Sequence, residues 1–62
     1  MRAADVPEGH AFTYHDVPCV ALRAPEPTKD RFGRDMVKIY TRRLDTSEEG
    51  YVIYGPDARV PS

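Results

Sequence analysis

Residues 34–44 lie within the longest stretch of the chain without Gly or Pro, and β-branched residues recur there at every second position from 37 to 41. Val37, Ile39 and Thr41 fall on one face of this stretch. A period of two is the pattern of a β-strand with one buried face. We therefore expect a central strand here, with a second face that carries Met36, Lys38, Tyr40, Arg42 and Leu44.

Shorter alternating stretches predict four more strands, at residues 10–15, 19–24, 51–54 and 59–60. In the first of them, Phe12 and Tyr14 share a face. In the second, Val20 and Leu22 are the large apolar residues, so we expect them to face the core and their neighbours to face outward. Val and Ile together number eight against two Leu, which also favours strands over helices.

The connections follow from the Pro, Gly and polar residues between these stretches. Residues 1–8 are expected as a loosely ordered lead-in, and residues 25–34 as one long irregular loop. Phe32 in that loop either plugs the core or stands exposed as an anchor for a partner. Residues 45–50 fit a hairpin loop, and a short 3-10 turn is expected near residues 56–58.

The chain has 62 residues, which indicates a single domain over residues 1–62 with a small core. Domains of this size usually need a disulfide, a metal or a partner chain for stability. Cys19 is the only cysteine, so no disulfide can form within the chain. Association with a protein partner or with itself is the remaining source of stability.

Five short antiparallel strands with one long loop resemble an SH3-like small β-barrel. The segment at residues 50–60 (GYVIYGPDARV) carries this resemblance, because such barrels end in a strand, a 3-10 turn and a last short strand. The resemblance implies an all-β barrel. It implies no groove for Pro-rich peptides, because the chain has no Trp and no Ala-Leu-Tyr-Asp-Tyr type segment. SH3-like barrels bind proteins and nucleic acids alike, so the fold leaves the partner open.

The net charge of −1 conceals a basic middle between acidic ends. Residues 31–43 carry five basic side chains and one acidic, whereas acidic residues outnumber basic ones on both sides. A row of cations beside an aromatic ring suits an acidic protein surface, or phosphates and stacked bases, and it also suits plain solvation. The predicted partner-binding face consists of Arg31, Phe32, Arg34, Lys38, Tyr40, Arg42 and Arg43.

The sequence gives little support for a catalytic site or a metal-binding site. His10, His15 and Cys19 are zinc-ligand types but lack the close paired spacing of zinc sites. Cys19 and His15 could form a nucleophile and base, yet no oxyanion-binding device accompanies them. The acidic residues of the 45–50 connection suit solvation better than cation binding. We expect no metal, no cofactor and no catalytic residue, and phosphate-loop and dinucleotide motifs are absent.

These patterns predict a non-enzymatic protein-interaction module or accessory subunit of a larger assembly, such as a viral structural or inhibitory protein of a phage. The alternative is a small nucleic-acid-binding barrel that uses the same basic face. The chain has no apolar run long enough for a membrane span and no apolar core of a signal peptide. We therefore expect a cytoplasmic protein, or one located in the virion if a virus encodes it.

Overall fold

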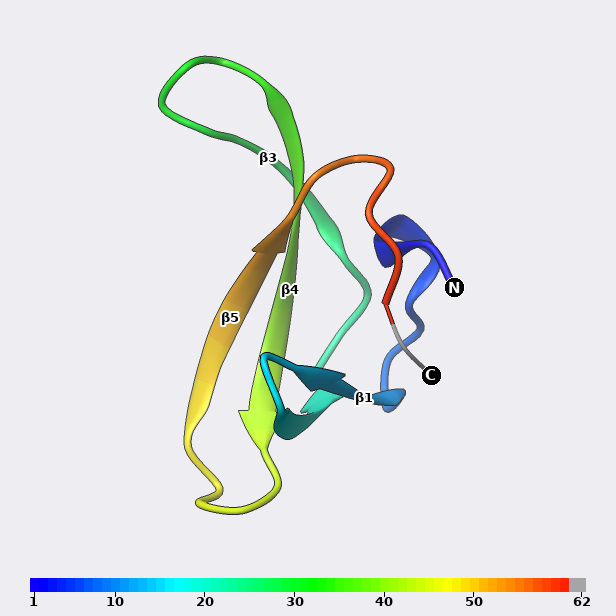
Figure 1. Cartoon of the computed structure of the whole chain (residues 1–62), viewed down its shortest axis with the longest axis vertical. Helices are drawn as coiled ribbons and strands as arrows, with labels where there is room; N and C mark the ends of the chain where they lie inside the picture. The colour runs from blue at the N-terminus through cyan, green and yellow to red at the C-terminus, as the bar shows by residue number, and fades with distance from the viewer. Residues whose placement is uncertain (61–62) are drawn as a thin grey trace.

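The computed structural model describes residues 1–60, which contain five antiparallel strands and one short 3-10 helix (Figure 1). The predicted all-β class is therefore confirmed. Within these residues, no helix has the length and apolar character needed to cross a bilayer. The elements are η1 (Ala3–Asp5), β1 (Ala11–Tyr14), β2 (Val17–Ala21), β3 (Glu26–Lys29), β4 (Asp35–Arg43) and β5 (Glu49–Tyr54).

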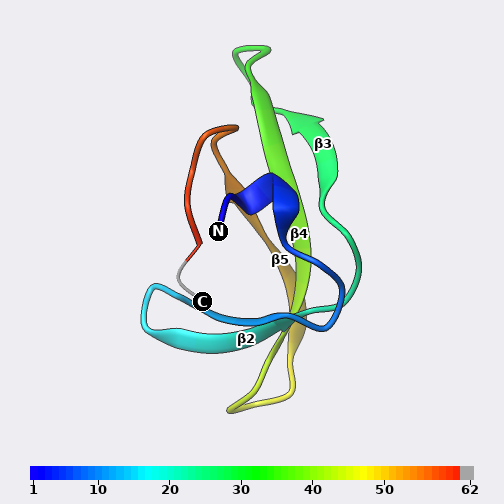
Figure 2. The same cartoon turned by 90° about the vertical axis from the view of Figure 1, so that its right-hand side faces the viewer.

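Strand β4 organises the sheet, because three other strands pair with it. On one edge, β3 pairs with its first half and β2 with its second half, while β5 runs along the other edge. Figure 2 shows β4 spanning the whole height of the molecule. Strand β1 pairs only with β2. Among residues 1–60 no backbone pairing joins β5 to β1, so the sheet is not closed.

The predicted faces of β4 are confirmed. Val37, Ile39 and Thr41 are buried, with Ile39 fully inaccessible to solvent, and the residues between them are half-buried. Because strand side chains alternate, β4 gives one face to the core and leaves the other outside. Tyr14 and Tyr54 pack against the edge of the core, which comprises Ala3, Val6, Phe12, Cys19, Ala21, Val37, Ile39, Val52 and Val60.

The predicted faces of β2 are reversed. Cys19 and Ala21 are buried, whereas Val20 and Leu22 are half-buried on the outside. Cys19 lies directly opposite Phe12 in the sheet, and opposite residues share a face. The Phe12 ring is itself buried, so a small side chain fits beside it. The Cys19 thiol also donates to the carbonyl of Phe12, at 3.4 Å.

The long irregular loop predicted over residues 25–34 is wrong for its first half. Residues Glu26–Lys29 form β3, an edge strand paired with the first half of β4. Pro27 is compatible with this position, because an edge strand has one side on which a missing N–H matters little. The irregular part of residues 25–34 is therefore Pro25, which precedes β3, and the tight turn between Lys29 and Asp35.

The two ends of the described chain lie side by side (Figure 1). Arg2 and Arg59 form an antiparallel bridge, and the Val60 amide donates to the Met1 carbonyl at 2.7 Å. The predicted last strand is thus a single bridge. Residues 1–8, expected as a loosely ordered lead-in, contain η1 and place Ala3 and Val6 in the core, at 0% and 1% exposure. Their small apolar side chains therefore belong to the core cluster.

A turn does form where the 3-10 turn was expected. The Ala58 amide donates to the Gly55 carbonyl at 3.1 Å, which is the i to i+3 spacing of a single 3-10 turn. This turn directs the chain from the end of β5 back across the core. Val60 then reaches its buried position beside η1.

Candidate interaction surface

The face of the sheet that points away from the core is here called the outer face. Three of the predicted binding residues lie on it. Lys38, Tyr40 and Arg42 lie in a row along β4, as their spacing predicted. Strand pairing places Ile53, Tyr51 and Glu49 of β5 opposite these three residues in turn. The outer face comprises Val20, Leu22, Glu26, Thr28, Met36, Lys38, Tyr40, Arg42, Glu49, Tyr51 and Ile53.

Cations and aromatic rings gather at the centre of the outer face. The Lys38 ammonium lies 4.9 Å from the centre of the Tyr40 ring and 4.3 Å from that of Tyr51. The two rings meet at an angle of 65° with 6.3 Å between their centres. The Arg23 guanidinium lies over Tyr40 at 4.1 Å. Cation–π contacts hold all four side chains together, and we call them the aromatic-cation cluster.

Apolar side chains surround this cluster. Val20, Leu22, Met36 and Ile53 are half-buried, while Tyr51 is 59% exposed. The core itself uses small residues such as Ala3, Cys19 and Ala21. A large share of the aliphatic side chains of this small protein therefore lies outside the core, where a second molecule can cover it.

The predicted basic residues on β4 differ in whether they form ion pairs and with which carboxylate. Arg42 pairs with Glu49 at 3.0 Å, whereas Lys38 makes no salt bridge within residues 1–60. Arg43 lies on the opposite face from Arg42 and binds Asp45 through two hydrogen bonds, of 3.1 and 3.0 Å. The Arg43 guanidinium thereby lowers the pKa of the Asp45 carboxyl. The structure does not bring Arg43 together with the other predicted binding residues.

The turn between β3 and β4, residues 30–34, is here called the tip; it projects beyond the rest of the sheet (Figure 1). The Asp30 carboxylate accepts hydrogen bonds from the amides of Phe32 and Arg34, at 2.8 and 2.9 Å. The Phe32 side chain is 73% exposed, so it is not a plug for the core. The guanidinium groups of Arg31 and Arg34 lie 5.3 and 6.0 Å from its ring. Arg31, Phe32 and Arg34, predicted as part of one partner-binding face, therefore form a patch of their own on the tip, separate from the row on β4.

Gly33 is the residue on which the shape of the tip depends. Its φ of +79° lies in the left-handed region, although a Cβ placed there would meet no atom within 4 Å. Gly33→Ala should therefore cost about 1 kcal/mol from backbone strain alone. Gly50→Ala, in β5, is the matched control: its surroundings are equally open and its φ is not positive, so it should be neutral or stabilising. Urea unfolding measures both, and equal effects would contradict this account of the tip.

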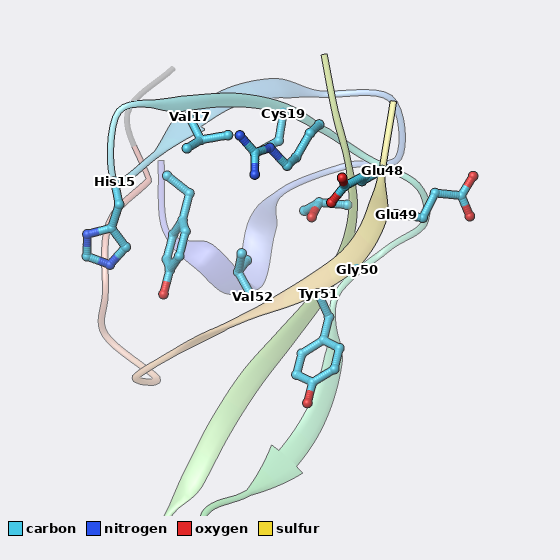
Figure 3. Close-up of a pocket in the computed structure, with 11 residues that line it drawn as sticks. His15, Val17, Cys19, Glu48, Glu49, Gly50, Tyr51 and Val52 are labelled. Carbon is cyan, nitrogen blue, oxygen red and sulfur yellow. The ribbon is translucent and has the colours of Figure 1, made fainter. Parts of the chain in front are cut away.

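A pocket of about 380 Å³ lies on the inner side of the sheet, between the β1–β2 turn and β5 (Figure 3). Figure 3 shows His15, Val17 and Cys19 on one side and the Gly50–Val52 segment on the other. Val52 points into this space and Tyr51 points away from it, toward the outer face. The pocket is lined by Tyr14, His15, Val17, Cys19, Thr41, Arg43, Glu48, Glu49, Gly50, Tyr51 and Val52.

Cys19 and His15 both line this pocket, but the surroundings of the thiol disfavour the thiolate. Burial raises the pKa of Cys19, and the thiol donates to a backbone carbonyl. A nucleophilic cysteine needs the opposite, a stabilised thiolate. Within residues 1–60, no three His, Cys, Asp or Glu side chains are grouped so that they could hold a metal ion. The buried Nε2 of His10 has no hydrogen-bond partner, and we have no physical account of it.

Sequence reasoning missed the contribution of β5 and of the strand edges to the outer face. Tyr51 and Ile53 complete the face that Lys38 and Tyr40 begin, and Arg23 covers it. The short connection between β4 and β5 contains the information that was missed, because the length of a hairpin loop fixes which residues of the two strands lie opposite each other. That register places Tyr51 opposite Tyr40.

Comparison of the chain with protein-family models and with curated proteins finds no match in either case. The outer face and the tip are therefore the basis on which a function is assigned.

Proposed function

We propose that this chain is a non-enzymatic interaction module, an accessory subunit that binds a protein partner through the outer face. The observation that carries this proposal is the aromatic-cation cluster. Its Lys38 ammonium rests on two tyrosine rings and has no carboxylate partner within residues 1–60. Tyrosine and arginine side chains surrounded by apolar area, here Tyr40, Tyr51 and Arg23, are typical of protein interfaces. The partner surface that fits is apolar with a carboxylate near its centre.

We also propose that the fold is an open SH3-like barrel. The ring of Tyr14 in β1 meets that of Tyr54 in β5 edge to face, with 5.5 Å between their centres. This side-chain contact lies where backbone pairing would close a barrel. The turn after β5 and the returning chain at residues 55–60 support the same interpretation.

A protein partner is favoured over nucleic acid by the ion pairs of the outer face. Arg42 and Arg23 are paired with Glu49 and Glu26, at 3.0 and 3.6 Å. A polyanion lying along this face would meet those carboxylates, which repel phosphates. The tip favours the second candidate function, because exposed Phe32 between two arginines could stack on a base.

The test of the proposed function is a charge reversal on the outer face. Tagged wild-type protein is purified from its native host, and the affinity of the co-purified partner is then measured with purified components. Lys38→Glu should weaken binding at least tenfold, about 1.4 kcal/mol, because it puts a carboxylate against an acidic surface. The control is Arg2→Glu, the same charge change at an exposed residue away from the outer face.

Two results would contradict the proposal. One is a folded Lys38→Glu protein that binds the partner as tightly as the wild type. The other is an affinity for single- or double-stranded nucleic acid that falls steeply with salt and is lost in Phe32→Ala, which would establish the second candidate function instead.

A further inference from the structure

Strand β5 has a free edge. It pairs with β4 alone among residues 1–60, and in Figure 1 no other segment lies along its far side. The hydrogen-bonding direction of this edge follows from the hairpin, where the Arg43 amide donates to the Glu48 carbonyl at 2.8 Å. Successive strand residues direct their backbone groups to opposite edges. The N–H and C=O groups of Glu49, Tyr51 and Ile53 therefore point to the free edge.

The free edge of β5 has few of the features that prevent strands from pairing with other molecules. Such features are prolines, charged side chains (lysines above all), bulges and very short strands. The other two edge strands have several of them: β3 contains Pro27 and Lys29, and β1 has only four residues. Strand β5 has six residues, Glu-Gly-Tyr-Val-Ile-Tyr, with no proline and no lysine, and its one charged residue is the first, Glu49. The chain thus protects two of its edges against pairing and leaves the third open.

We infer that β5 pairs with β5 of a second copy of this chain, antiparallel about a two-fold axis. With Tyr51 opposite Tyr51 of the second copy, Glu49 lies opposite Ile53 of the second copy. The backbone groups of Glu49, Tyr51 and Ile53 that point to the free edge of each strand then form about six hydrogen bonds between the two copies. The two sheets become one, and their outer faces join into a single continuous surface.

Charge complementarity selects a second copy as the occupant of this edge. Lys38 lies beside Ile53 within one chain, so the proposed register brings Glu49 of one copy two strands away from Lys38 of the other. That separation is about 10 Å between the Cα atoms, which the two long side chains can span over Ile53, so Glu49 lies between Arg42 of its own chain, its ion-pair partner at 3.0 Å, and Lys38 of the other copy. The two-fold axis repeats the contact. An isologous interface needs this self-complementarity: the edge has an acidic group at one end, Glu49, and at the other end Ile53 with Lys38 beside it.

The dimer should be weak, because the interface is one short strand and the side chains beside it. Interfaces of this kind lie at the low end of the size range, and a dissociation constant on the order of micromolar is expected. The inference shares Lys38 with the proposed function, but its test measures self-association rather than binding of a partner protein, so the failure of one is distinguishable from the failure of the other.

Sedimentation velocity between about 1 and 500 μM tests the inference, with full-length protein. The wild type should shift from the 7.0 kDa monomer toward twice that mass as concentration rises. Ile53→Pro removes an N–H that faces the free edge and none that β4 uses, so it should weaken the dimer at least tenfold. Ile53→Thr keeps the N–H and is the matched control. A wild type that stays monomeric throughout overturns the inference, as does a folded Ile53→Pro variant with unchanged dimerisation.

A cross-linking measurement tests the register even if the proline variant fails to fold. The two-fold axis places the Cα atoms at position 51 about 5.5 Å apart, within the range that a disulfide spans. Tyr51→Cys should therefore cross-link rapidly under mild oxidation, whereas Cys19 is buried and should not react. Glu8→Cys puts a thiol at an exposed position away from β5 and is the control. Equal rates of cross-linking for the two variants would overturn the proposed pairing.

Discussion

Replacing Ile39 with alanine is expected to remove most of the stability of this protein. Ile39 is fully buried at the centre of β4, where β5 pairs with it. Truncating such a side chain costs about 2–5 kcal/mol, from lost apolar burial and the cavity left behind. A domain of this length has a total stability of roughly 3–9 kcal/mol. Urea unfolding followed by circular dichroism should show a large fall in the midpoint, or an unfolded protein without urea.

The matched control is Ile53→Ala, one strand away on the outer face. Ile53 is only half-buried, so its truncation opens no enclosed cavity and should cost well under half as much. Similar losses for the two variants would mean that the outer face is as much a core as the inner one, and the division of the sheet into two faces would be wrong.

Introducing a charge at Val6 is expected to have a comparable effect, although Val6 precedes the first strand. Its side chain is 1% exposed and belongs to the core cluster. A buried carboxylate without a partner costs about 3–5 kcal/mol. Val6→Asp should therefore unfold the protein at neutral pH, as measured by circular dichroism and thermal unfolding.

A second variant tests whether the core position or the terminal segment in general is responsible. Asp5→Ala changes the neighbouring exposed residue and should leave the stability within about 0.5 kcal/mol of the wild type. A folded and stable Val6→Asp protein would show that residues 1–6 are dispensable for the core.

The fold was predictable where β-branched residues recur at every second position, and less so elsewhere. Val37, Ile39 and Thr41 do so within residues 34–44, so the faces of β4 followed from the sequence, and the hairpin loop at residues 45–50 indicated its pairing with β5. Strand β3 did not follow from the sequence, because Pro27 signals a break although an edge strand tolerates it. The facing of β2 failed for another reason. Val20 and Leu22 are larger than Cys19 and Ala21, but the smaller pair lies on the buried face, where Cys19 is opposite the buried ring of Phe12.

The candidate interaction surface was likewise predictable from the sequence only in part. The row of Lys38, Tyr40 and Arg42 needed only the period of a strand, and it was predicted. The position of Lys38 between two rings depends on Tyr51, and therefore on a cross-strand register. Arg43 differs from Arg42 by one residue, which in a strand means the opposite face. The prediction from the sequence placed Arg42 and Arg43 on one face because of their charge, and this disregards the alternation of side chains along a strand.

The bridge between Arg2 and Arg59 has a consequence for the order in which the protein folds. Closing the β3–β4 and β4–β5 hairpins orders only short loops, whereas closing the bridge must order almost the whole chain, and the entropic cost rises with loop length. The hairpins around β4 should therefore form early and the junction of the two ends last. In the native state that junction should open most often, and each opening exposes Ala3, Val6 and Val60 to solvent while the central sheet remains intact.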